Sequence, residues 1–133
     1  MSYLAGQPWI PLVILYHKWY HQNMEVLAHA AAAEEYRGLP EREQDAMDNA
    51  IAKLRGLGDQ LRYPHSSAVK GADRLRELRP RAGHSPWRAF YRCIGDVAVI
   101  GAFGPEAKVD PRGFRAAVQR AMDRLAAYEA KEG

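Results

Sequence analysis

Three apolar stretches in close succession, residues 75–79, 87–94 and 97–103, most constrain the fold of this chain. Each stretch alternates between side chains of different character, which is typical of β-strands. The dipeptide Gly95-Asp96 predicts a tight antiparallel turn between the last two. Together with their connections, the stretches carry five arginines and only two acids. The sheet must therefore accommodate several permanently charged side chains.

Helical periodicity and capping residues predict the other elements. Residues 24–29 are expected to form a short strand and residues 30–39 an alanine-rich helix. Pro40 suits the first position of a second helix, and Asp110 suits the cap of a C-terminal helix. Residues 59–73 are expected to form a loop because they are rich in Pro, Ser and Gly. The order predicts an α+β fold: a small antiparallel sheet, built from a strand, two helices and three strands, with a C-terminal helix.

Strand alternation assigns the arginines to one face of this sheet. Arg88 and Arg92 share a face of their strand, whereas Trp87, Ala89 and Tyr91 lie on the other. Arginine is almost never buried without a partner. With helices expected on one face only, we predict an open, concave and basic second face. On this interpretation, alanine at position 88 would abolish activity and leave folding nearly intact.

Composition favours a single cytoplasmic domain that binds a polyanion. The chain has 133 residues, and its one cysteine, Cys93, fits a reducing compartment. The apolar run 9–16 is too short to span a bilayer and lacks the flanks of a signal peptide. Residues 1–52 hold three Lys and Arg against seven Asp and Glu, whereas residues 53–133 hold sixteen against nine. Such a concentrated basic field attracts phosphate backbones.

No motif predicts a metal or a cofactor. His17 and His21 stand four residues apart, but no third ligand lies at a supporting spacing. The chain has no phosphate-binding P-loop, no dinucleotide fingerprint and no Gly-x-Ser-x-Gly nucleophile motif. We therefore expect neither a metal nor a cofactor.

Metal-independent RNA cleavage remains compatible with this residue set. In that reaction the RNA 2′-hydroxyl attacks the adjacent phosphate, so the site needs positive charge and a group that transfers protons. Arginine supplies charge because its planar guanidinium binds phosphate through two donors. His84 suits proton transfer best by its ordinary pKa range. The other candidates for proton transfer are His65, Glu77, Tyr91 and Lys108.

The succession of motifs resembles the RelE/HigB toxins of type II toxin–antitoxin systems, and in particular their phage-derived HigB-like subgroup. Residues 75–79 match the Leu-x-Glu-Leu-Arg strand of that family, and residues 87–91 match its aromatic–Arg–x–apolar–Tyr strand. The resemblance covers about residues 24–110. It implies that residues 24–133 form one toxin domain and that residues 1–23 precede it as an N-terminal leader. The apolar run of that leader is expected to pack on a sheet edge or on a second chain.

The resemblance also implies an activity and partners. It implies ribosome-dependent cleavage of mRNA, controlled by a cognate antitoxin of the helix-turn-helix type, within a homodimer or a toxin–antitoxin hetero-oligomer. Arg88 matches the phosphate-binding arginine, Arg79 the basic end of the preceding strand, and Glu77 a structural carboxylate. Many relatives carry a Phe-x-Lys-Lys run where this chain keeps Lys108 alone. The predicted catalytic set is Arg88, Arg79, His84 and Lys108, and the predicted RNA-binding set is Arg62, Lys70, Arg76, Arg81, Tyr91 and Arg92.

Two alternatives remain at this point. ParE-like toxins keep the same fold but inhibit DNA gyrase. A catalytically silent RNA- or protein-binding module would also use a basic surface. A paired acid–base set beside Arg88 would favour the endonuclease, and its absence would favour the other two.

Overall fold

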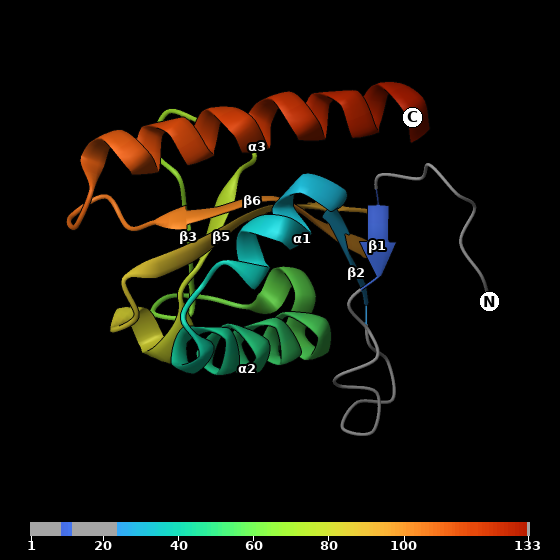
Figure 1. Cartoon of the computed structure of the whole chain (residues 1–133). Coiled ribbons are helices and arrows are strands. Elements are labelled where there is room, and N and C mark those ends of the chain that lie inside the picture. Colours follow the sequence, from blue (N-terminus) through green and yellow to red (C-terminus); the bar gives the residue numbers. More distant parts are fainter. Residues whose placement is uncertain (1–8, 12–23, 133) are drawn as a thin grey trace.

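The computed structural model describes residues 9–11 and 24–132, and it confirms the predicted α+β class and order of elements (Figure 1). The strands are β1 (Trp9–Pro11), β2 (Glu25–His29), β3 (Ser66–Ala68), β4 (Arg76–Leu78), β5 (Trp87–Ile94) and β6 (Val97–Pro105). The α-helices are α1 (Ala30–Arg37), α2 (Glu41–Leu57) and α3 (Pro111–Glu132), and the short 3₁₀ segments are η1 (Gly58–Gln60) and η2 (Pro80–Gly83). Within these described ranges, no helix is long and apolar enough to cross a membrane.

The strands of the described ranges form one mixed sheet in the order β1-β2-β6-β5-β4-β3. All neighbours are antiparallel except β2 and β6, which run parallel in the interior of the sheet. This pair corrects the prediction of a purely antiparallel sheet. The helical hairpin α1–α2 and three further strands separate β2 from β6 in the chain, so β6 can return beside β2 in the same direction.

Two edge strands, β1 and β3, extend the sheet beyond the predicted strands. β1 pairs with β2, with Trp9 opposite His29. This part of the predicted leader therefore lies on a sheet edge, and the rest of residues 1–23 lies outside the described residues. β3 comes from the segment that was expected to be a loop, and it pairs with β4.

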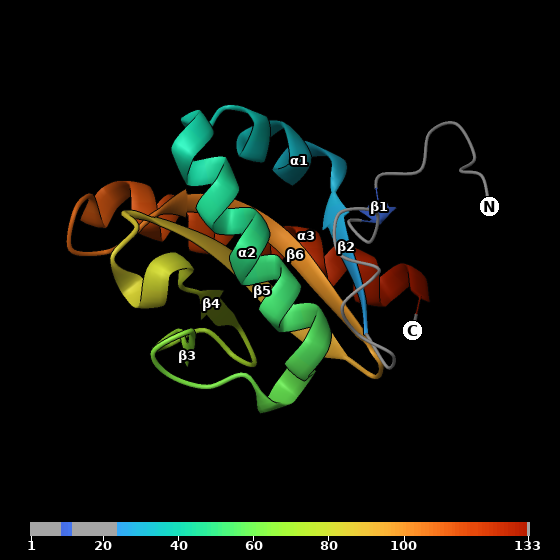
Figure 2. The ribbon, with the colours of Figure 1, turned by 90° about the horizontal axis from the view of Figure 1, so that it is seen from below.

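Helices cover both faces of the sheet. In Figure 1, α3 lies along one face, while α1 and α2 lie against the other; Figure 2 shows α1 and α2 in front of the strands and α3 behind them. The predicted open face is therefore wrong. The apolar stripe of α3, which includes Ala117, Ala121 and Leu125, packs on that face and forms a second core with Phe90 and Val99. The first core lies between the sheet and the α1–α2 hairpin.

Sequence periodicity explains why α2 and α3 pack as they do. On α2, Met47, Ile51 and Leu54 recur at helical spacing and are buried in the first core. At the start of α3, the carboxylate of Asp110 accepts a hydrogen bond from the backbone N–H of Gly113 at 2.9 Å. This contact is the predicted cap, and it satisfies one of the free donors of the first turn.

A bulge in β6 brings the strand close to α3. Phe90 pairs with Ala102 and Tyr91 with Ile100, so Gly101 has no partner on β5. A Cβ atom at Gly101 would lie 2.9 Å from the backbone of Ala121 on α3. Glycine is therefore required there for the helix to approach.

Candidate functional site

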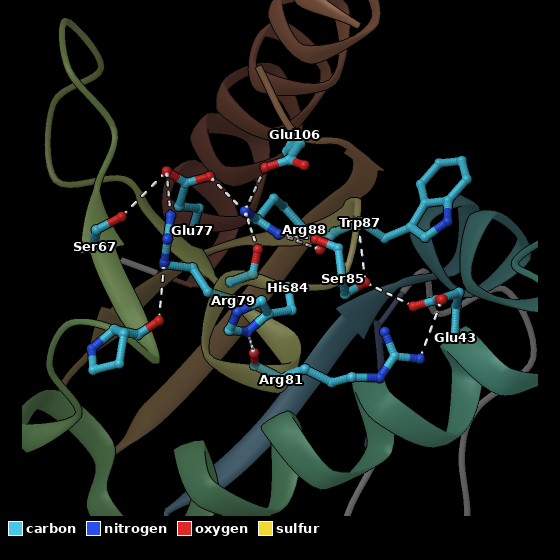
Figure 3. A network of polar contacts seen from close by, with 12 residues as sticks. Glu43, Ser67, Glu77, Arg79, Arg81, His84, Ser85, Trp87, Arg88 and Glu106 are labelled. Carbon is cyan, nitrogen blue, oxygen red and sulfur yellow. Dashed lines mark hydrogen bonds and ion pairs between the residues drawn. The ribbon is translucent and has the colours of Figure 1, made fainter. Parts of the chain in front are cut away.

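Three of the four predicted catalytic residues, Arg79, His84 and Arg88, lie at one end of the sheet, where β4 ends and β5 begins (Figure 3). The η2 segment connects β4 to β5 through three consecutive residues with left-handed backbone angles, Arg81, Ala82 and Gly83. Left-handed conformations are costly for residues other than glycine. A Cβ atom at Gly83 would lie 2.5 Å from an Arg79 guanidinium nitrogen, so the end of that side chain would have to shift if another residue replaced the glycine.

Arg88 is the buried centre of this site, with 2% of its surface exposed. Its Nε lies 3.3 Å from Glu77 Oε1, and its Nη2 lies 2.8 Å from Glu106 Oε1. Figure 3 shows the guanidinium between these two carboxylates. Nη1 also donates to the carbonyl of Ser85 at 2.6 Å, and Nη2 donates to the carbonyl of Gly83 at 3.4 Å. The guanidinium is therefore engaged inside the protein, which corrects the expectation of an open, phosphate-facing side chain.

Burial lowers the pKa of Arg88, although the carboxylates of Glu77 and Glu106 act in the opposite direction. The positive charge of Arg79 nearby adds to the lowering. Each of the two carboxylates offsets part of the local positive charge. The two carboxylates of Glu77 and Glu106 thus balance the two guanidinium charges of Arg88 and Arg79.

Arg79 lies beside this buried pair but reaches the surface. Its Nε donates to the carbonyl of Pro64 at 2.9 Å, and its Nη1 lies 3.9 Å from Glu77 Oε2. The guanidinium carbon stands 5.0 Å from the ring centre of Tyr63, which is a cation–π contact. Arg79 also lines a surface pocket, so it is better placed than Arg88 to meet an anion.

His84 is exposed at the end of η2, directly after Gly83. Its Nδ1 lies 2.8 Å from the carbonyl oxygen of Arg81. A carbonyl only accepts hydrogen bonds, so Nδ1 carries the proton and Nε2 of the neutral ring is left as the basic atom. Lys108 is exposed in the turn between β6 and α3, two residues after Glu106.

A basic pocket opens between α2 and the β4–η2 segment. Its volume is about 150 Å³, and its polar lining consists of Asn49, Lys53, His65, Arg79 and Arg81. The Nζ of Lys53 lies 3.5 Å from Nδ1 of His65. Lys53 was missing from the sequence predictions. The signal that could have found it is helical spacing, because Asn49 and Lys53 are four residues apart on the same face of α2.

Comparisons with known proteins identify the family of this chain. The model of the phage-derived Gp49-like protein family matches residues 34–101, which is just over half of the chain. The chain belongs to the Gp49-like family. No curated protein matches its sequence significantly.

The Gp49-like chain also resembles a solved toxin structure. A double arginine-to-alanine mutant of the E. coli toxin RelE in the free state superposes with a TM-score of 0.54 at 15% sequence identity. The match covers 74% of this chain and 97% of the RelE chain. At this identity the match establishes the fold. This RelE-like fold is the one that the resemblance to RelE/HigB toxins implied.

Two of the predicted RNA-binding residues of this Gp49-like chain are buried. Arg92 is 4% exposed and lies under α3, where its Nη1 is 2.7 Å from Glu129 Oε1. Tyr91 is 1% exposed, and its hydroxyl lies 2.6 Å from Ser66 Oγ. Burial raises the pKa of Tyr91, which opposes ionisation of its hydroxyl. Neither side chain presents a surface to RNA in this structure.

The other predicted RNA-binding residues lie at or near the surface. Arg62 and Lys70 are exposed on either side of β3. Arg76 is half-buried and donates to Ser66 Oγ at 2.9 Å. Arg81 is exposed and forms an ion pair with Glu43 at 3.1 Å. Among the residues with described positions, no group of three His, Cys, Asp or Glu could hold a metal ion, and His17 and His21 lie outside that part of the chain.

Proposed function

We propose that this Gp49-like chain is the toxin of a type II toxin–antitoxin pair and that it cleaves mRNA on the ribosome without a metal. The observation that carries the proposal is the rim at Gly83. There the Arg79 guanidinium packs against the glycine, and the exposed imidazole of His84 follows it directly. A permanent cation and a titratable base thus share one accessible edge of a RelE-like fold.

The proposed reaction divides the chemistry among separate residues. Arg79 holds the scissile phosphate and stabilises the charge of the transition state. Nε2 of His84 accepts the proton of the 2′-hydroxyl as that oxygen attacks phosphorus. The bond from phosphorus to the 5′-oxygen breaks, and the ammonium of Lys108 gives that oxygen a proton. The products are a 2′,3′-cyclic phosphate and a free 5′-hydroxyl.

Arg88 acts in this proposal as a positioning residue. It donates to backbone carbonyls on both sides of His84, those of Gly83 and Ser85. It also pairs with Glu77, which in turn lies near Arg79. Two of the residues that would touch the RNA, Arg79 and His84, therefore depend on Arg88 for their placement.

The test is to map the 5′ ends of mRNA after incubating the purified chain with translating ribosomes. Arg79→Gln and His84→Gln should each lower the cleavage rate by about a hundredfold, because each removes one transition-state interaction. Arg115→Gln, which alters an exposed arginine on α3, is the matched control. Full activity in both site variants would disprove the assigned roles.

The two ion pairs of Arg88 favour a second candidate function. Two carboxylates already pair with it, and the described residues place no histidine against its guanidinium. A same-fold module without RNA cleavage, such as a ParE-like gyrase inhibitor, needs no such phosphate site. Supercoiling defects with intact mRNA after induction would support this alternative over the endonuclease.

A toxin also requires an inhibitor. We propose a helix-turn-helix antitoxin whose acidic, amphipathic segment pairs with the chain in the cytoplasm, giving a toxin–antitoxin hetero-oligomer in preference to a toxin homodimer. The excess of Lys and Arg over Asp and Glu in residues 53–133 favours an acidic partner segment. Association with the product of the neighbouring gene should slow several-fold between low and moderate salt, because long-range attraction is screened. If no neighbouring product binds and induction is harmless, the toxin assignment fails.

A further inference from the structure

We propose that the pocket between α2 and the β4–η2 segment binds a phosphate group of single-stranded RNA, and that Tyr63 stacks on an adjacent base. This site lies on the α2 side of Arg79 and shares that arginine with the rim at Gly83. The proposal rests on RNA being the ligand of the proposed function. It adds a contact to a nucleotide other than the one that is cleaved.

The charge of the pocket favours an anion. Lys53, His65, Arg79 and Arg81 line it, and no Asp or Glu is among the lining residues. Arg81 is partly neutralised because Glu43 pairs with it at the edge. Lys53 and His65 provide donors of the pocket's own, from α2 and from the segment before β3. Arg79 is shared with the rim at Gly83 and lies 3.9 Å from a carboxylate oxygen of Glu77.

The hydrogen bond between Lys53 and His65 makes the imidazole a donor as well. A lysine ammonium has no acceptor, so Nδ1 of His65 accepts from Lys53 Nζ at 3.5 Å. The proton of the neutral ring is then on Nε2. His65 therefore offers an N–H group, as the lysine and the arginine do.

The size of the pocket favours a single phosphate group. A volume of about 150 Å³ is enough to admit a group of several heavy atoms such as a phosphate. Ala46, Ala50 and Leu78 form the apolar part of the lining. Apolar walls lower the local dielectric constant, which strengthens the attraction between an anion and the basic side chains.

Tyr63 distinguishes RNA from an acidic peptide as the ligand. Its side chain is among the most exposed large apolar groups described, at 71%, and Arg79 stands over its ring. Proteins that hold single-stranded RNA combine a basic groove with exposed aromatic rings on which bases stack. An acidic peptide would use the positive charges alone. The neighbouring exposed ring therefore favours a nucleotide.

The test measures binding of a fluorescent heptauridylate to the purified full chain by anisotropy. Lys53→Gln and Tyr63→Ala should each weaken binding about tenfold, the effect of losing one charge-assisted hydrogen bond or one stacked base. For Lys53→Gln, the slope of log affinity against log salt should also become shallower by about 0.7. Lys131→Gln, at an exposed lysine on α3, should bind as the unmodified chain does.

Unchanged affinity in both pocket variants would overturn the proposal. A hexaglutamate peptide that binds more tightly than heptauridylate and loses affinity in Lys53→Gln would overturn it in favour of a peptide site. The proposed cleavage is tested separately. If the pocket variants bind normally while the unmodified chain still cuts mRNA, only the pocket assignment fails. If nothing is cut but binding falls in both variants, the pocket assignment stands alone.

Discussion

Arg88 connects three parts of the chain that are adjacent only in the folded protein. It pairs with Glu77 on β4, donates to carbonyls of the η2–β5 connection, and pairs with Glu106 after β6. Buried ion pairs add little net stability, but removing one partner leaves a charge without compensation. The arginine is therefore expected to be a structural requirement as much as a functional one.

Arg88→Ala should lower the free energy of unfolding by about 3–5 kcal/mol, since it leaves two partly buried carboxylates without their cation. Urea unfolding followed by circular dichroism measures this change. This reverses the expectation from sequence that folding would be nearly unaffected. Arg115→Ala on the exposed side of α3 should stay within about 0.5 kcal/mol of the unmodified chain. Equal stability of the two variants would contradict the structural role.

Residue alternation predicted which face of the sheet each β5 side chain occupies. It did not predict which helix covers that face. Phe90 lies in the α3 core and Tyr91 in the hairpin core, as the period of two requires. Glu106, one of the two acids that pair with Arg88, lies 18 residues further along the chain, and Glu129, which pairs with Arg92, lies 37 residues further. Nothing in the local pattern around either arginine reveals such distant partners.

At the scale of elements, the contact between β6 and α3 depends on small residues. A Cβ atom at Gly104 would overlap the Cβ of Ala117 on the facing helix. Gly104→Ala should therefore destabilise the protein by about 1–3 kcal/mol through overpacking. Thermal or urea unfolding measures the cost. Combining it with Ala117→Gly removes the overlap, so the double variant should be more stable than the sum of the two single losses predicts.

The contact between α2 and the η2–β5 connection should make stability depend on pH. Burial would raise the pKa of Glu43, but hydrogen bonds from Ser85 and Arg81 outweigh it and hold this pKa below its ordinary value of 4.5. A carboxylate with a lowered pKa stabilises the fold above its unfolded-state pKa, and this contribution is lost as the pH falls through the lower, folded-state value.

Glu43→Gln should consequently be less stable than the unmodified chain near neutral pH, and the difference should shrink as the pH falls below 4.5. Urea midpoints measured across that range provide the test. Arg115→Gln, at an exposed position on α3, changes no carboxylate; it is the control and should show no such trend. A difference that stays constant with pH would rule out the assigned role of Glu43.

The elements that were predicted well have strong local signals. The bounds of β5 and the start of α3 follow from alternation and from the Asp110 cap. The short β3 has no such signal, because two serines and an alanine are weak strand formers. The site was predicted in part for the same reason. Arg79 and His84 follow a recognisable strand, whereas Lys53 joins them only through the packing of α2 on the sheet.

At the scale of the whole molecule, we predict that residues 24–133 fold without residues 1–23. β2 pairs in parallel with β6, and its Val26 and Ala28 are buried in the core beneath the α1–α2 hairpin, so we expect these contacts to persist without β1. Circular dichroism and cooperative urea unfolding of the truncated chain test this. An unfolded spectrum would contradict it. A chain that lacks only residues 1–8 is the control, because it retains β1 and protects the edge of β2 from intermolecular pairing.

The bulge at Gly101 restricts where this chain can gain or lose residues. Before it, Ala98 and Ile100 face the α1–α2 hairpin; after it, Ala102 faces α3 and Phe103 faces the hairpin. Deleting one residue here would exchange the faces of everything that follows in β6 and move an aromatic ring from one core into the other. Length variation among functional descendants of this chain should therefore accumulate in the exposed connection around Gly71, between β3 and β4, and be absent from β6.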